Sequence, residues 1–329
     1  MSDKPKFAMY WAASCGGCEI AVLNINEKIL DVDANFEVVF WPVAMDAKVK
    51  DVEAMPDKSI LLTLFNGGMR NSDNVAMAKL MRQKSQILVS FGSCATEGCI
   101  PGLANLASKK EIFDTAYQTI TTDNPQNLRP QCSTTVLEGE LHIPEFFPVL
   151  RTLDEVVDVD YYMPGCPPES SQIAAVVALV VDVLHGKATL PPKGSVIGAG
   201  ASTVCDECSR TRNVKTIKKF VRVQDLAVID PQVCLLEQGI PCNGPATRSG
   251  CGALCPKASA QCIGCYGPAD DVPDFGARLM TAFSSVIDSN DPAEIDRILD
   301  SLPDPAGQFY RFNLAKSLLR AARPAWRNE

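Results

Sequence analysis

Residues 6–18 read KFAMYWAASCGGC, and residues 86–94 read QILVSFGSC. Each stretch begins with an apolar run of the kind that forms a buried β-strand. Each run then gives way to glycine and cysteine, which are typical of a loop that does chemical work rather than of a strand interior. These two stretches therefore predict strands that carry cysteines just beyond their carboxyl ends.

The same signals continue outward over the first 190 residues. Strands are predicted over residues 6–11, 36–41, 59–65, 86–91 and 156–162, and helices over residues 19–29, 72–83 and 168–184. Strands that alternate with helices indicate an α/β fold with a doubly wound parallel sheet. Residues 104–150 interrupt the alternation with polar, proline-bearing sequence, which we interpret as an insertion.

The composition changes after Leu190-Pro191-Pro192-Lys193-Gly194, which predicts a boundary between a domain of residues 1–190 and one of residues 191–329. Residues 205–265 hold eight cysteines together with many glycines and prolines, so this segment is not expected to build a conventional core. Residues 270–329 lack cysteine and are predicted to be helical, with a helix start at Asp291-Pro292. The second domain is thus predicted to be smaller, mostly irregular and helical.

Overall composition excludes several classes of protein. Of the 329 residues, 46% are hydrophobic and 21% charged, which is typical of a globular protein, and the net charge of −8 argues against nucleic-acid binding. The longest apolar stretch, Ile173–Val181, is about half of what a membrane span needs. No secretory leader is evident, so we expect a cytoplasmic protein, in which spaced cysteines indicate metal or redox chemistry rather than disulfides.

Four cysteines lie where predicted strands end: Cys15, Cys18, Cys94 and Cys166. Because the carboxyl ends of parallel strands share one edge of the sheet, these four thiols are expected to converge there. Four thiolates at one point suit a [4Fe–4S] cluster or a structural zinc ion. Cys15 and Cys18 taken alone would also fit a dithiol redox pair.

The second half of the chain holds eight more candidate ligands. Contiguity suggests two groups of four, namely Cys205, Cys208, Cys234 and Cys242, and Cys251, Cys255, Cys262 and Cys265. Zinc is the structural alternative, but three neighbouring iron–sulfur clusters would make physical sense as an electron relay. Cys99 and Cys132 remain; we expect free structural thiols, with Cys99 as a possible spare ligand. No nucleotide-binding loop and no nucleophile set is evident, so the chain is expected to carry electrons rather than convert a substrate.

The motifs CGGCE, GSCATEG and GCPP, followed by a CxxC pair and a cysteine-dense second half, resemble the small subunit of [NiFe] hydrogenases. The resemblance implies a flavodoxin-like first domain and three [4Fe–4S] clusters. It also implies that Cys15, Cys18, Cys94 and Cys166 hold the proximal cluster. The medial cluster would be held by Cys251, Cys255, Cys262 and Cys265, and the distal cluster by Cys205, Cys208, Cys234 and Cys242.

Departures from the periplasmic branch point to a subgroup. Cys205 stands where that branch has a histidine ligand, Cys255 supplies a fourth medial ligand, and a twin-arginine leader is missing. The chain is thus most similar to cytoplasmic, methyl-viologen-reducing, deazaflavin-non-reducing hydrogenases. This implies a large subunit with the Ni–Fe centre, and a further iron–sulfur subunit with a heterodisulfide-reductase-type complex as acceptor. The alternatives are a deazaflavin- or NAD(P)-linked hydrogenase and, from another class, a multi-zinc adaptor protein.

Two further features stay open at this level. Glu19 follows Cys18, where it could relay protons, contact a partner or simply favour the start of a helix. Residues 210–222 (RTRNVKTIKKFVR) carry six basic residues and no acidic one. This stretch is either a solvated helix face or a face near an anionic cluster or an acidic partner.

Overall fold

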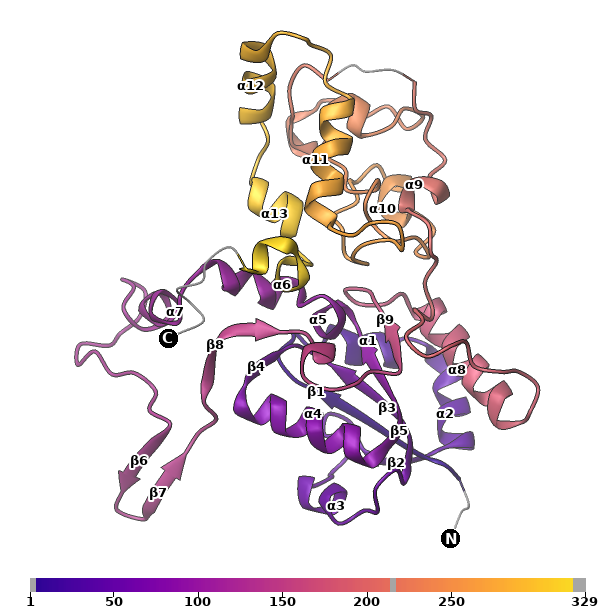
Figure 1. The fold of residues 1–329 in the computed structure, drawn as a ribbon, viewed down its shortest axis with the longest axis vertical. Helices are drawn as coiled ribbons and strands as arrows, with labels where there is room; N and C mark the ends of the chain where they lie inside the picture. The colour runs from indigo at the N-terminus through magenta and orange to yellow at the C-terminus, as the bar shows by residue number, and fades with distance from the viewer. Residues whose placement is uncertain (1–3, 214–216, 322–329) are drawn as a thin grey trace.

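The computed structural model describes residues 4–213 and 217–321. Its centre is a five-stranded, fully parallel sheet in the order β2-β1-β3-β5-β9 (Figure 1). This is the flavodoxin-like strand order, which confirms the predicted doubly wound sheet. The strands are β1 (Lys6–Trp11), β2 (Glu37–Phe40), β3 (Ile60–Asn66), β5 (Ser85–Phe91) and β9 (Tyr161–Met163).

Helices cover both faces of the sheet because alternate residues of each strand point to opposite sides. Phe7 and Met9 of β1 belong to a core with α1 (Gly17–Leu23), α2 (Ile29–Asn35) and α8 (Ser170–Leu184). Ala8 belongs to a second core, on the other face, with α3 (Val49–Glu53) and α4 (Ser72–Lys84). Figure 1 shows α1, α2 and α8 on one side of the sheet and α4 on the other.

Two predicted elements differ in extent. The single helix expected over residues 19–29 is divided, because Asn26 adopts a left-handed backbone conformation (φ 57°) between α1 and α2. The strand expected over residues 156–162 is reduced to β9. Just before it, the side chain of Asp160 accepts a hydrogen bond from the Leu88 N–H and pairs with Arg82.

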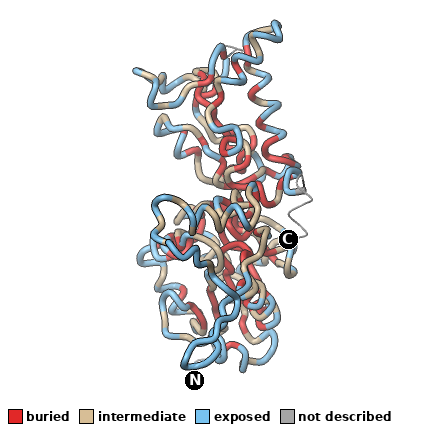
Figure 2. The backbone as a smooth tube through the Cα atoms, turned by 90° about the vertical axis from the view of Figure 1, so that its left-hand side faces the viewer, coloured by how far each residue is buried: buried red, intermediate tan, exposed pale blue. Residues whose placement is uncertain are grey.

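The interrupting region is structured. The short helices α5 (Ser93–Thr96) and α6 (Cys99–Gly102) precede it, and it contains α7 (Lys109–Tyr117) and then a hairpin of β6 (Ser133–Val136) and β7 (Gly139–His142). The hairpin projects from the body of the chain and is exposed along its length (Figures 1 and 2). The chain then returns as β8 (Phe146–Arg151), which pairs antiparallel with β4 (Met69–Asn71).

The cysteine-rich half has its own core, contrary to expectation. Phe220, Leu236 and Ile240 from the cysteine-rich segment pack with Leu279 and Phe283 of the following helix. The segment therefore does not form this core alone; the cysteine-free tail completes it. The helices here are α9 (Val204–Glu207), α10 (Leu254–Lys257), α11 (Phe275–Ser285), α12 (Pro292–Asp300) and α13 (Pro305–Tyr310).

The end of the described tail returns to the first half of the chain. Lys316 forms an ion pair with Asp154 at 2.9 Å, and the Cys99 N–H donates to the Phe312 carbonyl at 3.0 Å. Residues 322–329 of the predicted helical tail lie outside the described residues. The boundary at residues 190/191 falls between α8 and α9 and stays a prediction. No helix in the described ranges is long and apolar enough to span a membrane.

Candidate functional site

Strand register brings the first four cysteines to one edge of the sheet. Trp11, Asn66, Phe91 and Met163, the last residues of β1, β3, β5 and β9, are paired in one row across the sheet. The segments that follow three of these strands carry Cys15, Cys18, Cys94 and Cys166, which we call the proximal set; Cys18 lies in the first turn of α1 and Cys94 in α5. Burial raises the pKa of the Cys18 thiol, and negative charges on the other three thiols of the set raise it further. The four thiols thus lie close enough to interact electrostatically.

Glycine makes room for the sulfur atoms of the proximal set. Gly92, directly after β5, has φ 79° and ψ 156°, a conformation open essentially only to glycine. A Cβ atom at this position would lie 2.3 Å from Cys18 Sγ. Ser93 ties two of the loops together, because its N–H donates to the Gly165 carbonyl at 2.8 Å. The loop after β5 is thereby held against the loop after β9.

A fifth cysteine joins the proximal set in space. The buried Cys99 thiol donates to Cys166 Sγ at 3.4 Å. This hydrogen bond and one to Cys94 raise the pKa of Cys99, whereas the same contact lowers the pKa of Cys166. The only signal in the sequence was its position five residues after Cys94. Cys132, by contrast, is exposed and lies just before the β6–β7 hairpin.

Glu19 is buried in the first turn of α1, with 1% of its surface exposed. The Trp41 indole N–H donates to its Oε2 atom, and its Oε1 atom has no hydrogen-bond partner in the described ranges. Burial raises the pKa of this carboxyl to about 7, although the Trp41 hydrogen bond acts in the opposite direction. A role limited to favouring the helix start would not require such burial.

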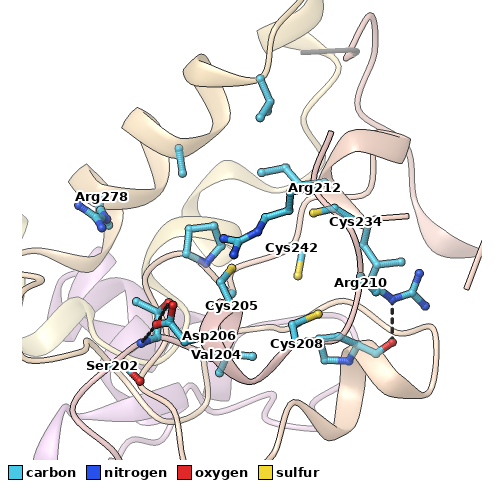
Figure 3. A pocket seen from close by; sticks show the side chains of 18 of the residues that line it. Ser202, Val204, Cys205, Asp206, Cys208, Arg210, Arg212, Cys234, Cys242 and Arg278 are labelled. Carbon is cyan, nitrogen blue, oxygen red and sulfur yellow. Dashed lines mark hydrogen bonds between the residues drawn. The ribbon is translucent and has the colours of Figure 1, made fainter. Parts of the chain in front are cut away.

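The second group, which we call the distal set, consists of Cys205, Cys208, Cys234 and Cys242. All four line an open cavity of about 670 Å³ in the cysteine-rich half (Figure 3). Burial and then the charge of Cys242 raise the pKa of Cys205 to about 12. A Cβ atom on Gly244 would lie 3.1 Å from Cys205 Sγ, so glycine again leaves space beside a sulfur atom.

The third group, the medial set, consists of Cys251, Cys255, Cys262 and Cys265. Burial raises the pKa of Cys265 to about 12, with further contributions from the charges of Cys251, Cys166 and Cys255. Burial also raises the pKa of Cys262, and Cys242 of the distal set is the largest charged influence on it. Cys262 therefore lies on the side of the medial set that adjoins the distal set.

Two hydrogen bonds join the sets in series. The hydroxyl of Ser93, which precedes Cys94 of the proximal set, donates to the carbonyl of Cys265 in the medial set at 2.6 Å, and Cys166 packs in one cluster with Cys265. The Cys262 N–H of the medial set donates to Cys242 Sγ of the distal set at 3.4 Å. The three sets are thus arranged in the order proximal, medial, distal, with the medial set touching both neighbours.

The donor chemistry of the sets is that of iron–sulfur sites. Each set offers four sulfur donors, and backbone N–H groups point at sulfur atoms, an arrangement that tunes such clusters. Gly92 and Gly244 leave room for sulfur where a side chain would collide with it. The residues present therefore fit an iron–sulfur group. Within residues 4–213 and 217–321, no three cysteine, histidine or acidic side chains form a single-ion site.

Comparison with known proteins gives the family. A family described as "NADH ubiquinone oxidoreductase, 20 Kd subunit" matches residues 15–180. The iron–sulfur subunit of the F420-non-reducing hydrogenase of Archaeoglobus profundus is 41% identical to this chain, over 95% of this chain and 97% of the relative. The chain belongs to the family of [NiFe] hydrogenase small subunits. Hydrogenase small subunits contain iron and sulfur and pair with a Ni–Fe large subunit, on which catalysis occurs.

Two further comparisons are consistent with this family and with its fold. A subunit of the F420-non-reducing hydrogenase of Methanothermobacter marburgensis is 33% identical over 97% of each chain. The solved structure of the [NiFeSe] hydrogenase from Desulfovibrio vulgaris Hildenborough covers 88% of this small subunit with 99% of its own chain, at a TM-score of 0.50 and 16% identity. At that identity, the structural likeness speaks for the fold alone.

Proposed function

We propose that this small subunit carries electrons between the Ni–Fe centre of a large subunit and a further acceptor, through three [4Fe–4S] clusters in series. The observation that supports the proposal is the pair of hydrogen bonds that joins the three cysteine sets, from the Ser93 hydroxyl beside Cys94 to the Cys265 carbonyl and from the Cys262 N–H to Cys242 Sγ. A purely structural set of metal sites would not need to touch end to end. A relay requires it, because electrons hop only between neighbouring centres.

In this proposal, each set of four thiolates holds one cluster: Cys15, Cys18, Cys94 and Cys166 the proximal one, Cys251, Cys255, Cys262 and Cys265 the medial one, and Cys205, Cys208, Cys234 and Cys242 the distal one. When bound, such clusters accept and release one electron at a time. The chain supplies burial around Cys18, Cys94, Cys242 and Cys262, which excludes water from the sulfur atoms. Its backbone N–H groups offset part of the negative charge on sulfur.

The two ends of the series differ in their surroundings. The proximal set lies at the edge of the sheet, where we propose that the large subunit binds. The distal set lines the open cavity at the other end, where we propose that the electrons leave. By likeness to the F420-non-reducing relatives, we propose as acceptor a further iron–sulfur subunit with a heterodisulfide-reductase-type complex, in the cytoplasm. Co-purification of a flavoprotein that reduces F420 or NAD(P) with H₂ would instead identify a deazaflavin- or NAD(P)-linked enzyme.

The substitution Cys18→Ser in the complex with the large subunit tests the relay. We expect hydrogen–deuterium exchange, which needs only the large subunit, to continue while reduction of viologen dyes by H₂ is lost. Cys132→Ser, an exposed cysteine outside the three sets, is the control and is expected to retain both activities. Dye reduction at the wild-type rate by the Cys18→Ser complex would overturn the proposal.

A further inference from the structure

Arg212 is a cation that faces the distal set and forms no hydrogen bond or ion pair with the described residues, although its charge also reaches Asp206 in the same cavity. Three arginines line the cavity, namely Arg210, Arg212 and Arg278. The guanidinium of Arg210 donates to the carbonyls of Asp230 and Val233, at 2.6 and 2.9 Å, and so belongs to the scaffold. Arg278 is within ion-pair distance of Asp271, at 3.7 Å. Arg212 has neither a hydrogen bond nor an ion pair with any residue in the described ranges.

Figure 3 shows the side chain of Arg212 extended into the cavity toward Cys205, whereas Arg210 points away from it. The charge of Arg212 also acts on a thiol of the distal set. Burial and the charge of Cys242 raise the pKa of Cys205, and the charge of Arg212 lowers it.

Hydrogen bonds of the residues before and after Arg212 hold the backbone at this position. Thr211 donates to the Gln232 carbonyl at 2.7 Å and accepts from the Cys234 N–H at 2.8 Å. On the other side, the Asn213 N–H donates to a carboxylate oxygen of Glu237 at 2.7 Å. The residue before Arg212 is therefore bonded to a member of the distal set itself. Residues 210–213 and 217–222 form no helix, so the solvated helix face considered for this basic stretch is wrong for its described part; residues 214–216 lie outside it.

We propose that Arg212 is a counter-charge of the distal set, which stabilises the more negative, reduced form of the cluster held there and raises its reduction potential. The inference rests on the proposed function, because it requires a cluster on these four cysteines. Four thiolates and a cluster carry net negative charge, and reduction adds one more. A guanidinium beside them favours the added electron, and it does so without contributing a ligand. An electron that arrives from the medial set is thereby drawn toward the exit.

The test is a redox titration of the whole complex followed by EPR, with the signal of the distal set assigned by its loss in Cys205→Ser. In Arg212→Gln, we expect the ratio of reduced to oxidised distal cluster at a fixed potential to fall by about tenfold, a shift of about 59 mV for a one-electron couple. Arg212→Lys keeps the charge and is expected to restore most of the wild-type ratio. Because Arg212 is exposed, the difference between wild type and Arg212→Gln should shrink at high ionic strength.

Arg278→Gln is the matched control. It removes a cation from the same cavity, but one that Asp271 already balances, and is expected to leave the ratio near wild type. An unchanged ratio in Arg212→Gln, with iron and sulfide content at wild-type level, would overturn the role of Arg212 and leave the relay standing. If the wild-type protein shows no EPR signal of a cluster that is lost in Cys205→Ser, the relay itself is overturned.

Discussion

The fit between Gly92 and Cys18 gives the sharpest prediction. In Gly92→Ala, the new Cβ atom would lie 2.3 Å from Cys18 Sγ. That is at least about 1.2 Å closer than the optimum for nonbonded contacts of about 3.5–4.0 Å, whereas metal–ligand distances tolerate only about 0.2 Å. The backbone conformation of Gly92 adds a strain of about 1–3 kcal/mol for any residue with a side chain. The Cys18 sulfur must therefore move, and the cluster that we propose for the proximal set could not form as in the wild type.

The assay is anaerobic purification of the complex, followed by iron and sulfide analysis and H₂-driven dye reduction. We expect Gly92→Ala to lose about four iron atoms per chain, the content of one cubane cluster, and most of its dye reduction. Gly186→Ala is the control, because Gly186 also has a positive φ (71°) but has no atom within 4 Å of the new Cβ. It should keep its iron, although it too places a side chain at a residue of positive φ. Wild-type iron content and activity in Gly92→Ala would refute the placement of Cys18 at this edge of the sheet.

Three further predictions concern residues around the sets. Cys99→Ser is expected to keep wild-type iron content, because four other thiols complete the proximal set; loss of iron would make Cys99 a ligand. Burial raises the pKa of Glu97 to about 7, with the charge of Lys316 acting the other way. Its protonated form thus favours folding at low pH, and this contribution disappears as the pH rises through about 7. Glu97→Gln should therefore raise the melting temperature relative to wild type at about pH 8 but not at about pH 5, and equal effects at both pH values would contradict this. Lys316→Met leaves Asp154 without its cation and should lower the free energy of unfolding by about 1–3 kcal/mol. Arg320→Met, which removes the more exposed ion pair with Glu155, should lower it less. Equal losses in the two variants would count against the ion pair of Lys316 and Asp154.

Much of the first half of the chain could be predicted from the sequence because its signals are local. The apolar runs at Lys6–Trp11 and Ser85–Phe91 become strands, and the cysteines that follow them share one edge because parallel strands do. The helix expected over residues 19–29 failed at one residue, Asn26, whose backbone turn the pattern of apolar residues does not reveal.

Features that depend on distant parts of the chain could not be predicted. The core of the cysteine-rich half needs Leu279 and Phe283, which come from a helix beyond the last cysteine. Phe312 reaches back to Cys99 at the start of α6, a contact between residues 213 positions apart in the sequence. The backbone hydrogen bonds beside Arg212 likewise depend on Gln232 and Cys234. The basic stretch alone therefore does not indicate which of its basic residues faces the distal set.

The central claim is that three [4Fe–4S] clusters are arranged in series in this small subunit. The most direct measurement is iron, acid-labile sulfide and zinc analysis of the complex purified without oxygen, with EPR spectra after reduction. The account predicts about twelve iron and twelve sulfide per chain in addition to the iron of the large subunit, with cubane-type signals and no zinc. About three zinc ions per chain and no cluster signal would contradict it.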